Sequence, residues 1–248
     1  MCTVTWLRTA GGYELFFNRD ELRTRATASP PTAAVTAGVR YLAPTDNEAG
    51  GSWLAVNEHG TTIGLLNAHP ATARAPSRVV SRGLLVRRLA DLADPRRLRE
   101  RIRDLELDRL QPFTIFAASP GKAAVLDWDG RALEARDPGS PFLLSSSSRD
   151  SGGAESARRR ALGRLLRDAP PSAAAHLAFH RSHLPARGPL SPCMHRDDAR
   201  TVSMTRIVVT DAAVATAYAA GPPCRSPLSS TAQLPRAAPD EAGGRPAG

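Results

Sequence analysis

The sequence is short of lysine, cysteine, aromatic residues and long apolar runs. Of its 33 basic residues only Lys122 is a lysine, and aromatic residues make up 5%. The cysteines Cys2, Cys193 and Cys224 are too few and too widely spaced for a disulfide framework. No apolar run is long enough for a membrane-spanning helix. Residues 1–13 lack the basic leader and apolar block of a signal peptide, so we expect a cytoplasmic protein.

The chain does carry an excess of positive charge. Its 33 Lys+Arg against 24 Asp+Glu give a formal net charge of +9 over 248 residues. The arginines are scattered among alanines and prolines, without a recognition helix, a finger or a strand motif that combines aromatic and basic residues. We therefore interpret them as a solvated surface and expect no nucleic-acid partner.

Two β-hairpins are predicted near the start of the chain. Residues 2–7 and 13–17 are β-rich runs joined by a glycine turn, and residues 53–66 contain a second hairpin. The first hairpin ends in the polar residues 18–21, and the second ends at Asn67. Polar clusters that directly follow buried strands often build functional sites.

The rest of the chain alternates between groups of strands and groups of helices. Strand–turn–strand connections indicate antiparallel sheets that the grouped helices must cover, which predicts a layered α+β domain. We expect residues 1–224 to form this domain, with residues 28–37 as a surface loop or edge segment, and residues 225–248 to form a disordered tail rich in Pro, Ala and Gly. The predicted helices are 79–92, 95–105, 154–166 and 173–183, and the later strands are 113–118, 123–128, 201–210 and 213–218.

Cys2 directly follows the initiator methionine, and its side chain is small enough for that methionine to be removed. The mature chain would then carry a thiol and a free α-amine on one residue. An α-amine titrates at about 7.7–8.0 and can take the proton of a thiol whose own pKa is about 8.5. One residue then supplies both nucleophile and base, without a catalytic histidine. The alternative is that Cys2 is a small apolar residue that starts an edge strand.

Several motifs together resemble the NRDE family, which includes the transport-and-Golgi-organisation proteins of eukaryotes. They are Met1-Cys2, the four residues Asn18-Arg19-Asp20-Glu21, the stretch Gly50-Gly51-Ser52-Trp53 and a strand that ends at Asn67. The resemblance is strong over residues 1–70. It implies an N-terminal-nucleophile hydrolase fold, a four-layer αββα sandwich with two antiparallel sheets between helical layers. Choloylglycine hydrolases and penicillin V acylases are relatives with this fold.

The resemblance also implies roles for individual residues. In the related acylases an Arg and an Asp assist the N-terminal cysteine, which corresponds here to Arg19 and Asp20, with Glu21 as an alternative acid. Asn67 would help to form the oxyanion hole. The arginine favours a thiolate by opposite charge, and the amide of the asparagine stabilises a developing oxyanion. The alternatives are an Arg19–Asp20 ion pair, a capping role for Glu21 and a turn role for Asn67.

Three further residues are candidates for supporting roles. The family often has Ser-Asn-Ser where this chain has serines at 145–147, so Ser146 replaces a possible second oxyanion donor with a shorter hydroxyl. Asn18 opens the four-residue motif. Arg196 precedes a late strand, which would place it at the rim of the pocket.

Two groups of histidine and cysteine suggest metal or haem ligation. Cys193 and His195 are separated by one residue, but no second pair with ligand spacing accompanies them, so we expect no metal site. His176, His180 and His183 share one face of a predicted helix. Such a row in a helix rich in Arg and Ala is typical of a solvated surface, and haem binding is the alternative.

The sequence thus predicts a cysteine hydrolase that cleaves a non-peptide amide or related acyl bond of a small molecule. The reaction would pass through an acyl-enzyme on Cys2 and need no metal or organic cofactor. A non-catalytic binding or trafficking protein for haem or an acyl lipid, on the same fold, is the alternative. The two differ in whether Cys2→Ala abolishes hydrolysis or leaves ligand binding unchanged. The oligomeric state stays open.

Overall fold

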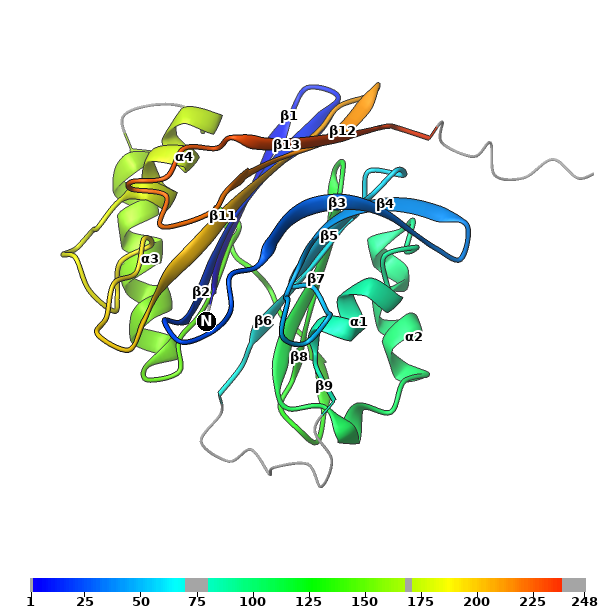
Figure 1. Ribbon diagram of the computed structural model, residues 1–248, viewed down its shortest axis with the longest axis horizontal. Coiled ribbons are helices and arrows are strands. Elements are labelled where there is room, and N and C mark those ends of the chain that lie inside the picture. The colour runs from blue at the N-terminus through cyan, green and yellow to red at the C-terminus, as the bar shows by residue number, and fades with distance from the viewer. Residues whose placement is uncertain (1, 70–79, 168–170, 238–248) are drawn as a thin grey trace, which may run out of the picture.

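Two antiparallel β-sheets lie face to face, and helices cover the outer face of each sheet (Figure 1). The computed structural model describes residues 2–69, 80–167 and 171–237. Along the stack the order of layers is helices, sheet, sheet and helices. This arrangement confirms the predicted αββα sandwich.

The six-stranded sheet carries the beginning of the chain. Its strand order is β10-β1-β2-β11-β12-β13, and its outer face is covered by α3 (Ser151–Leu165) and α4 (Ala173–Arg181). Because β1 pairs with both β10 and β2, Cys2 starts an inner strand and not an edge strand. The strands are β1 (Cys2–Thr9), β2 (Gly12–Leu22), β10 (Leu143–Ser146), β11 (Ala199–Val209), β12 (Ala213–Ala219) and β13 (Ser230–Pro235).

The seven-stranded sheet follows the chain order from β3 to β9. Its outer face is covered by α1 (Gly83–Arg88) and α2 (Leu98–Arg103), together with the 3₁₀ turns η1 (Pro95–Arg97) and η2 (Leu107–Arg109). As the edge strand, β3 takes up most of the segment 28–37. The strands are β3 (Ser29–Thr36), β4 (Val39–Thr45), β5 (Leu54–Asn57), β6 (Thr62–Asn67), β7 (Phe113–Ser119), β8 (Lys122–Trp128) and β9 (Leu133–Ala135).

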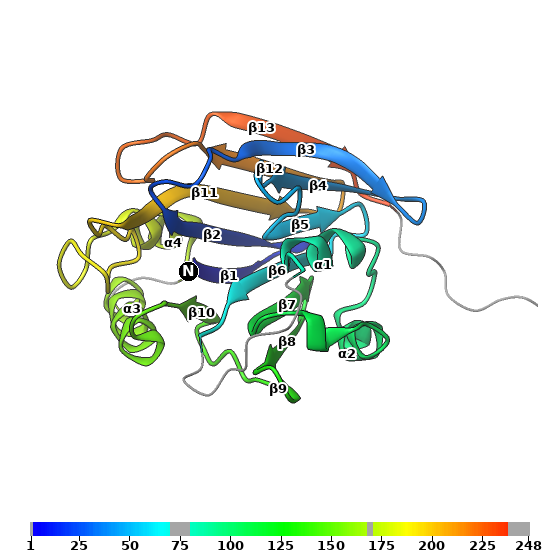
Figure 2. The same cartoon turned by 60° about the horizontal axis from the view of Figure 1, so that its bottom comes forward.

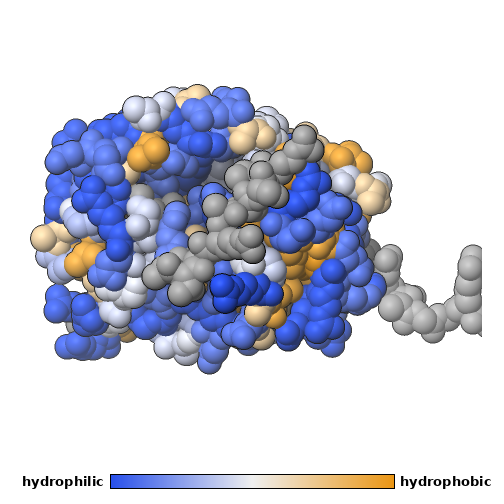
Figure 3. Space-filling view, turned by 90° about the horizontal axis from the view of Figure 1, so that it is seen from below, coloured by the Kyte–Doolittle hydropathy of each residue, from blue (hydrophilic) through white to orange (hydrophobic). Residues whose placement is uncertain are grey.

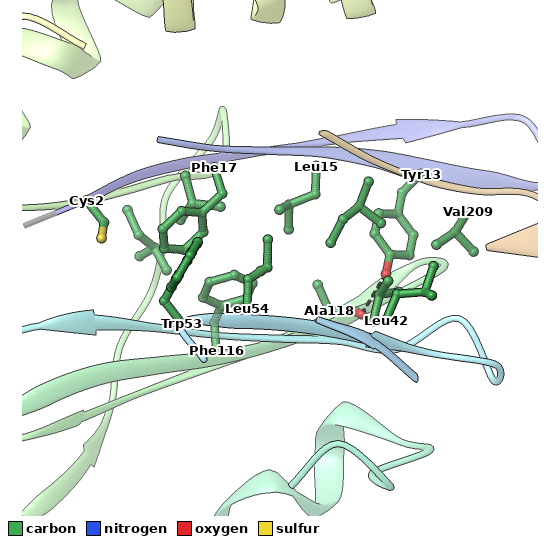
Figure 4. Packing of buried hydrophobic residues seen from close by; sticks show 14 of the residues in the cluster. Cys2, Tyr13, Leu15, Phe17, Leu42, Trp53, Leu54, Phe116, Ala118 and Val209 are labelled. Carbon is green, nitrogen blue, oxygen red and sulfur yellow. Dashed lines mark hydrogen bonds between the residues drawn. The ribbon is translucent and has the colours of Figure 1, made fainter. Parts of the chain in front are cut away.

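The main core lies between the two sheets and follows from side-chain alternation. In β2, Tyr13, Leu15 and Phe17 point toward the second sheet, where each is fully buried (Figure 4). Burial of each such side chain contributes about 1.5–3 kcal/mol. The Tyr13 hydroxyl lies 2.6 Å from the Thr62 hydroxyl and joins the sheets at the end of the core far from Cys2.

Many arginines are solvated as expected, although Arg19 and Arg158 are buried. Arg88, Arg96, Arg97 and Arg99 on the outer helices are exposed, and Figure 3 shows one face covered mostly by hydrophilic side chains. Among the helices of the described residues, none has the length and apolar character needed to cross a membrane.

Two strand boundaries differ from the prediction. Strand β2 continues to Leu22, so residues 18–21 lie inside the strand and not after it. These polar residues remain in the strand because β11 pairs with all four of them, while β1 pairs with Asn18 and Arg19. Strand β13 lies within the segment 225–248 that composition predicts to be disordered. Its backbone pairs along β12 and it buries Leu234, so the sheet extends beyond residue 224.

The predicted helices are present but shorter or divided. The helix predicted at 79–92 is represented by α1, and residue 79 lies outside the described residues. The segment 95–105 forms a 3₁₀ turn followed by α2. Helix α4 ends at Arg181, so His183 lies beyond it.

The prediction of a solvated histidine row is wrong for His176 and His180. Both rings are buried against β1, where the Thr5 hydroxyl lies 2.8 Å from His176 Nδ1 and 2.9 Å from His180 Nε2. Both rings also stack on Phe16. One hydroxyl has a single proton, so at most one ring accepts from Thr5 and at least one ring donates to it. These contacts use one nitrogen atom of each ring and fix both imidazoles in the packing against β1.

Burial of these histidines predicts a loss of stability in mild acid. It lowers the pKa of His176 to about 4 and that of His180 well below its usual value. Below about pH 6.5 the unfolded chain takes up protons that the native state excludes, so the free energy of unfolding falls by up to about 1.4 kcal/mol per pH unit for each ring. Urea unfolding between about pH 7 and pH 5 measures this slope. In a His176→Asn variant, which does not titrate there, the slope is expected to be shallower; an unchanged slope contradicts the assignment.

Candidate active site

The thiol of Cys2 lies at one end of the space between the two sheets. Cys2 is the first residue of β1, and its Sγ atom points toward the second sheet, like the side chains of Phe17 and Leu15 (Figure 4). A cavity of about 410 Å³ opens at this point. Its lining includes Cys2, Arg19, Asp20, Glu21, Asp46, Trp53, Asn67 and Arg82. The first strand therefore delivers its thiol to a cavity that both sheets border.

Close backbone packing forms one wall of this cavity. The Ser52 N–H donates to the Gly83 carbonyl at 3.0 Å, which joins the Gly50-Gly51-Ser52 stretch to the start of α1. A Cβ atom on Gly51 would lie 2.6 Å from the backbone carbon of Gly83, so only glycine permits this approach. Arg82, just before α1, thereby reaches the cavity wall.

Arg19 lies directly opposite Cys2 in the β1–β2 ladder, on the same face of the sheet. Its guanidinium carbon is 4.3 Å from the centre of the Trp53 ring, and its Nη2 atom is 3.1 Å from Asp46. Glu21, two residues along β2 and so on the same face, also pairs with Arg19 at 3.5 Å. Arg19 is thus a fixed, 5% exposed cation beside the thiol, and its ionic partners are Asp46 and Glu21, not Asp20.

Asp20 points to the other face of the sheet, under α3. Its carboxylate is 3.4 Å from the Nη2 atom of Arg158, and both side chains are fully buried. The Thr201 hydroxyl donates to the same carboxylate at 2.6 Å. Burial raises the pKa of Asp20 and lowers that of Arg158, while the opposite charge of each partner resists the shift.

Arg158 connects this carboxylate to the beginning of β1. Its Nη1 atom lies 3.5 Å from the Cys2 carbonyl oxygen and donates to the Ser145 hydroxyl at 2.8 Å. Its Nε atom donates to the Ser191 carbonyl at 3.2 Å. The Asp20 carboxylate therefore reaches the Cys2 backbone through Arg158, while the Asp20 backbone lies against the thiol.

Arg158 is not among the site residues that the sequence predicts. The residue lies on the buried stripe of α3 together with Ala154, Ala161 and Leu162. That stripe follows the i, i+3, i+4 spacing of a helix that packs against a core. An arginine on such a stripe was the available clue that a buried anion lay opposite.

Of the three candidates for supporting roles, the structure places only Ser146 in contact with Cys2. The backbone N–H of Cys2 donates to the Ser146 hydroxyl at 3.2 Å, so Ser146 contacts the nitrogen of Cys2. The Asn18 side chain faces the helices and donates to the His180 and Pro192 carbonyls at 2.8 and 2.9 Å. Arg196 pairs with Asp198 at 2.5 Å and is not part of the cavity lining.

Burial dominates the protonation of the Cys2 thiol. It raises the pKa of Cys2, whereas a hydrogen bond from the Asp20 backbone and the positive charge of Arg19 act in the opposite direction. A buried thiol of this kind needs a nearby base before it becomes a strong nucleophile.

The family of the chain follows from its sequence. The model of the family Transport and Golgi organisation 2 matches residues 1–148, more than half of the chain. The chain belongs to this family. The match confirms the resemblance carried by Cys2 and residues 18–21. No curated protein matches the sequence of the chain.

Solved structures similar to this member of the Transport and Golgi organisation 2 family are hydrolases and acylases. The N-acylethanolamine-hydrolyzing acid amidase orthologue of Caenorhabditis elegans has a TM-score of 0.57 at 15% identity, over 84% of this chain and 92% of that chain. A cysteine-to-alanine mutant of the conjugated bile acid hydrolase from Clostridium perfringens has a TM-score of 0.60 at 10% identity, over 87% and 88%. Penicillin V acylase from Agrobacterium tumefaciens has a TM-score of 0.52 at 10% identity, over 90% and 84%. At such low identity, the structural similarity establishes only the fold of the chain. That fold is the predicted N-terminal-nucleophile hydrolase fold.

Proposed function

We propose that this protein is an N-terminal cysteine hydrolase that cleaves a non-peptide amide or related acyl bond of a small molecule. The observation that carries the proposal is the position of the Cys2 thiol, at the first residue of β1 and directed into a cavity. The fixed cation of Arg19 lies beside it, and the amide of Asn67 lines the same cavity.

Removal of Met1 is the activating step in this proposal. While Met1 is attached, the nitrogen of Cys2 belongs to a peptide bond and cannot accept a proton. After removal the same nitrogen is an α-amine, which titrates at about 7.7–8.0 and can take the proton of the adjacent thiol. The Ser146 hydroxyl, 3.2 Å from this nitrogen, then holds the amine, and the buried Asp20–Arg158 pair holds the Cys2 carbonyl beside it. The proposal takes Asp20 as the assisting acid, and the contact of its partner Arg158 with the Cys2 carbonyl supports this role.

The thiolate then attacks the carbonyl carbon of the substrate. The carbonyl oxygen gains negative charge, and the Nδ2 hydrogen atoms of Asn67 with backbone N–H groups stabilise it, a type of contact worth about 3 kcal/mol in the transition state. The C–N bond breaks, the α-ammonium returns its proton to the leaving amine, and a thioester remains on Cys2. Water, deprotonated by the same amine, hydrolyses the thioester and releases the acid.

The structural neighbours support a small acyl or amide substrate, since they are named as an amidase, a hydrolase and an acylase. No contact among the described residues specifically supports haem binding. Among the described residues that line the cavity there is no histidine, and Thr5 engages both His176 and His180.

Peptide-mapped mass spectrometry after brief treatment with a mild cysteine-directed electrophile tests the proposal. We expect the mature chain to start at Cys2 and this thiol to react well before Cys193 and Cys224, which serve as internal controls. The neighbouring α-amine provides the thiolate at Cys2, whereas burial raises the pKa of Cys193 to about 12. A variant with a bulky residue in place of Cys2, such as Cys2→Leu, keeps Met1 and shows whether its removal depends on the small side chain.

Two results would count against the proposal. Retention of Met1 in the purified protein removes the only base assigned to the thiol. A chain that starts at Cys2 but reacts there no faster than at Cys224 shows that the amine does not activate the thiol. A panel of N-acyl amines, assayed for release of free amine, then measures turnover directly.

A further inference from the structure

Four potential metal ligands meet away from the cavity of Cys2, in a part of the fold that the proposed function does not use. They are His183, Cys193, His195 and Cys224, and one donor atom from each lies within 4.8 Å of the others. The first three come from the segment between α4 and β11, and Cys224 comes from the β12–β13 connection. Figure 2 shows these two connections, in yellow and orange, at the same end of the molecule. We propose that these four residues bind a structural zinc ion.

The distances between the donor atoms suit a tetrahedral ion. With Zn–S bonds of about 2.3 Å and Zn–N bonds of about 2.0–2.1 Å, the edges of the tetrahedron measure about 3.3–3.8 Å. The Nε2 atom of His195 is 3.5 Å from the Cys193 sulfur and 3.6 Å from the Cys224 sulfur. Two edges already have the required length, and the longest separation needs to close by only about 1 Å.

The chemistry of the donor set also favours zinc. Two thiols and two imidazoles with no carboxylate form the Cys₂His₂ set of structural zinc sites, whereas calcium and magnesium prefer oxygen ligands. The Nε2 atom of His183 is buried without a hydrogen-bond partner in the described part of the chain, and its ring lies 5.0 Å from that of His195. Such an unpaired atom is costly in a folded protein, and a metal bond satisfies it.

One contact must change when zinc binds. Arg187 Nη2 lies 3.3 Å from His195 Nδ1, the atom that carries the ring proton once Nε2 holds a metal. The Arg187 side chain is part of an exposed loop, so it can turn away at little cost. All four tetrahedral positions belong to protein ligands, which leaves no open position for substrate and makes the site structural.

The local sequence does not predict this site. Cys193 and His195 lacked a second pair at ligand spacing, but the fold supplies His183 from just beyond α4 and Cys224 from a distant connection. Local spacing does not predict this site, because 28 residues, including a hairpin, separate His195 from Cys224.

The zinc site would hold the segment that supports the buried Asp20–Arg158 pair. In this segment the carbonyls of Ser191 and Pro192 accept hydrogen bonds from Arg158 and Asn18. The Met194 N–H donates to the Thr201 hydroxyl at 2.8 Å, and that hydroxyl donates to Asp20. Loss of the ion is therefore expected to loosen residues 188–194.

Metal analysis of the full chain, loaded with Zn²⁺ under reducing conditions and desalted, tests the proposal. We expect one zinc per chain in the parent protein and loss of the ion in Cys224→Ser and His183→Gln. Cys2→Ser, the same chemical change outside the cluster, should retain it. Hydrogen exchange should quicken at residues 188–194 after chelation.

A second measurement does not depend on whether a variant folds. Titration of the metal-free parent protein with Co²⁺ should produce a sulfur-to-metal charge-transfer band and the visible bands of a tetrahedral site. The proposal is overturned if the protein retains no zinc and Co²⁺ produces no such band. It is also overturned if Cys193 and Cys224 form a disulfide in the presence of zinc. Equal zinc content in Cys224→Ser and the parent assigns the ion to other residues and also overturns it.

Discussion

Replacement of Cys2 by alanine is expected to lower kcat for hydrolysis by about 10⁴-fold or more, because the nucleophile is lost and no other group can form the acyl-enzyme. The fold should persist, since Cys2 lies at the start of β1 and a smaller side chain leaves its backbone pairing intact. Release of amine from an N-acyl substrate, with a thermal melt of each protein, checks both expectations.

A control at the other end of the same strand separates catalysis from folding. Thr9 is the exposed last residue of β1 and lies far from the cavity, so Thr9→Ala should keep full activity. Cys2→Ser tests the chemistry further, because a hydroxyl beside an α-amine is a weaker nucleophile than a thiol and should give a much slower reaction. Unchanged turnover in Cys2→Ala contradicts the proposed mechanism. Ligand binding without turnover in the parent protein, unaffected by Cys2→Ala, favours a carrier instead.

The second large effect is expected at Arg158. Arg158→Met removes the cation from a buried pair and leaves the Asp20 carboxylate uncompensated, a change that costs about 3–5 kcal/mol of folding free energy. It also removes hydrogen bonds to Ser145 and Ser191. Denaturant unfolding measures the loss, and activity at low temperature, where the variant stays folded, shows whether the Cys2 end of β1 is misplaced.

The neighbouring residue provides a matched control. Arg160 lies two residues along the same helix but is exposed, so Arg160→Met should change stability little. In the double variant of Asp20→Asn with Arg158→Met, no buried charge remains, and the destabilisation should be smaller than the sum of the single effects. Additive effects in this cycle mean that the two side chains do not interact, and a stability loss in Arg160→Met equal to that in Arg158→Met places the effect in the helix as a whole.

Stability and activity are therefore expected to separate at this site. The cavity face carries Cys2, Arg19 and Asn67, whose substitution should affect turnover more than folding. The helix face carries Asp20 and Arg158, whose substitution should affect folding first. The backbone of β2 joins the two faces. A substitution that displaces β2 from the helix side should therefore also displace Cys2, because Cys2 pairs with Arg19 of β2.

The strand assignment of the four-residue motif shows how far local patterns reach. The residues of the motif and the spacing from Cys2 were readable in the sequence, and so were the family and the αββα sandwich. The division of the motif between two faces was not, because polar residues 18–21 look like the end of a strand. Pairing with β11 along all four residues keeps them in the strand. A period of two then directs the side chains of Arg19 and Glu21 to the cavity and those of Asn18 and Asp20 to the helices.

The sequence by itself determined the family, the layered architecture and the hairpins, because these depend on local periodicity and on motifs within residues 1–70. Only the tertiary structure decided which polar side chains from distant parts of the chain contact each other. Asp20 meets Arg158 across 138 positions of sequence, and Cys224 meets His195 across 29. Contacts of this kind arise when separate layers pack, and no periodicity of three to four residues or of two encodes which distant side chains will face each other.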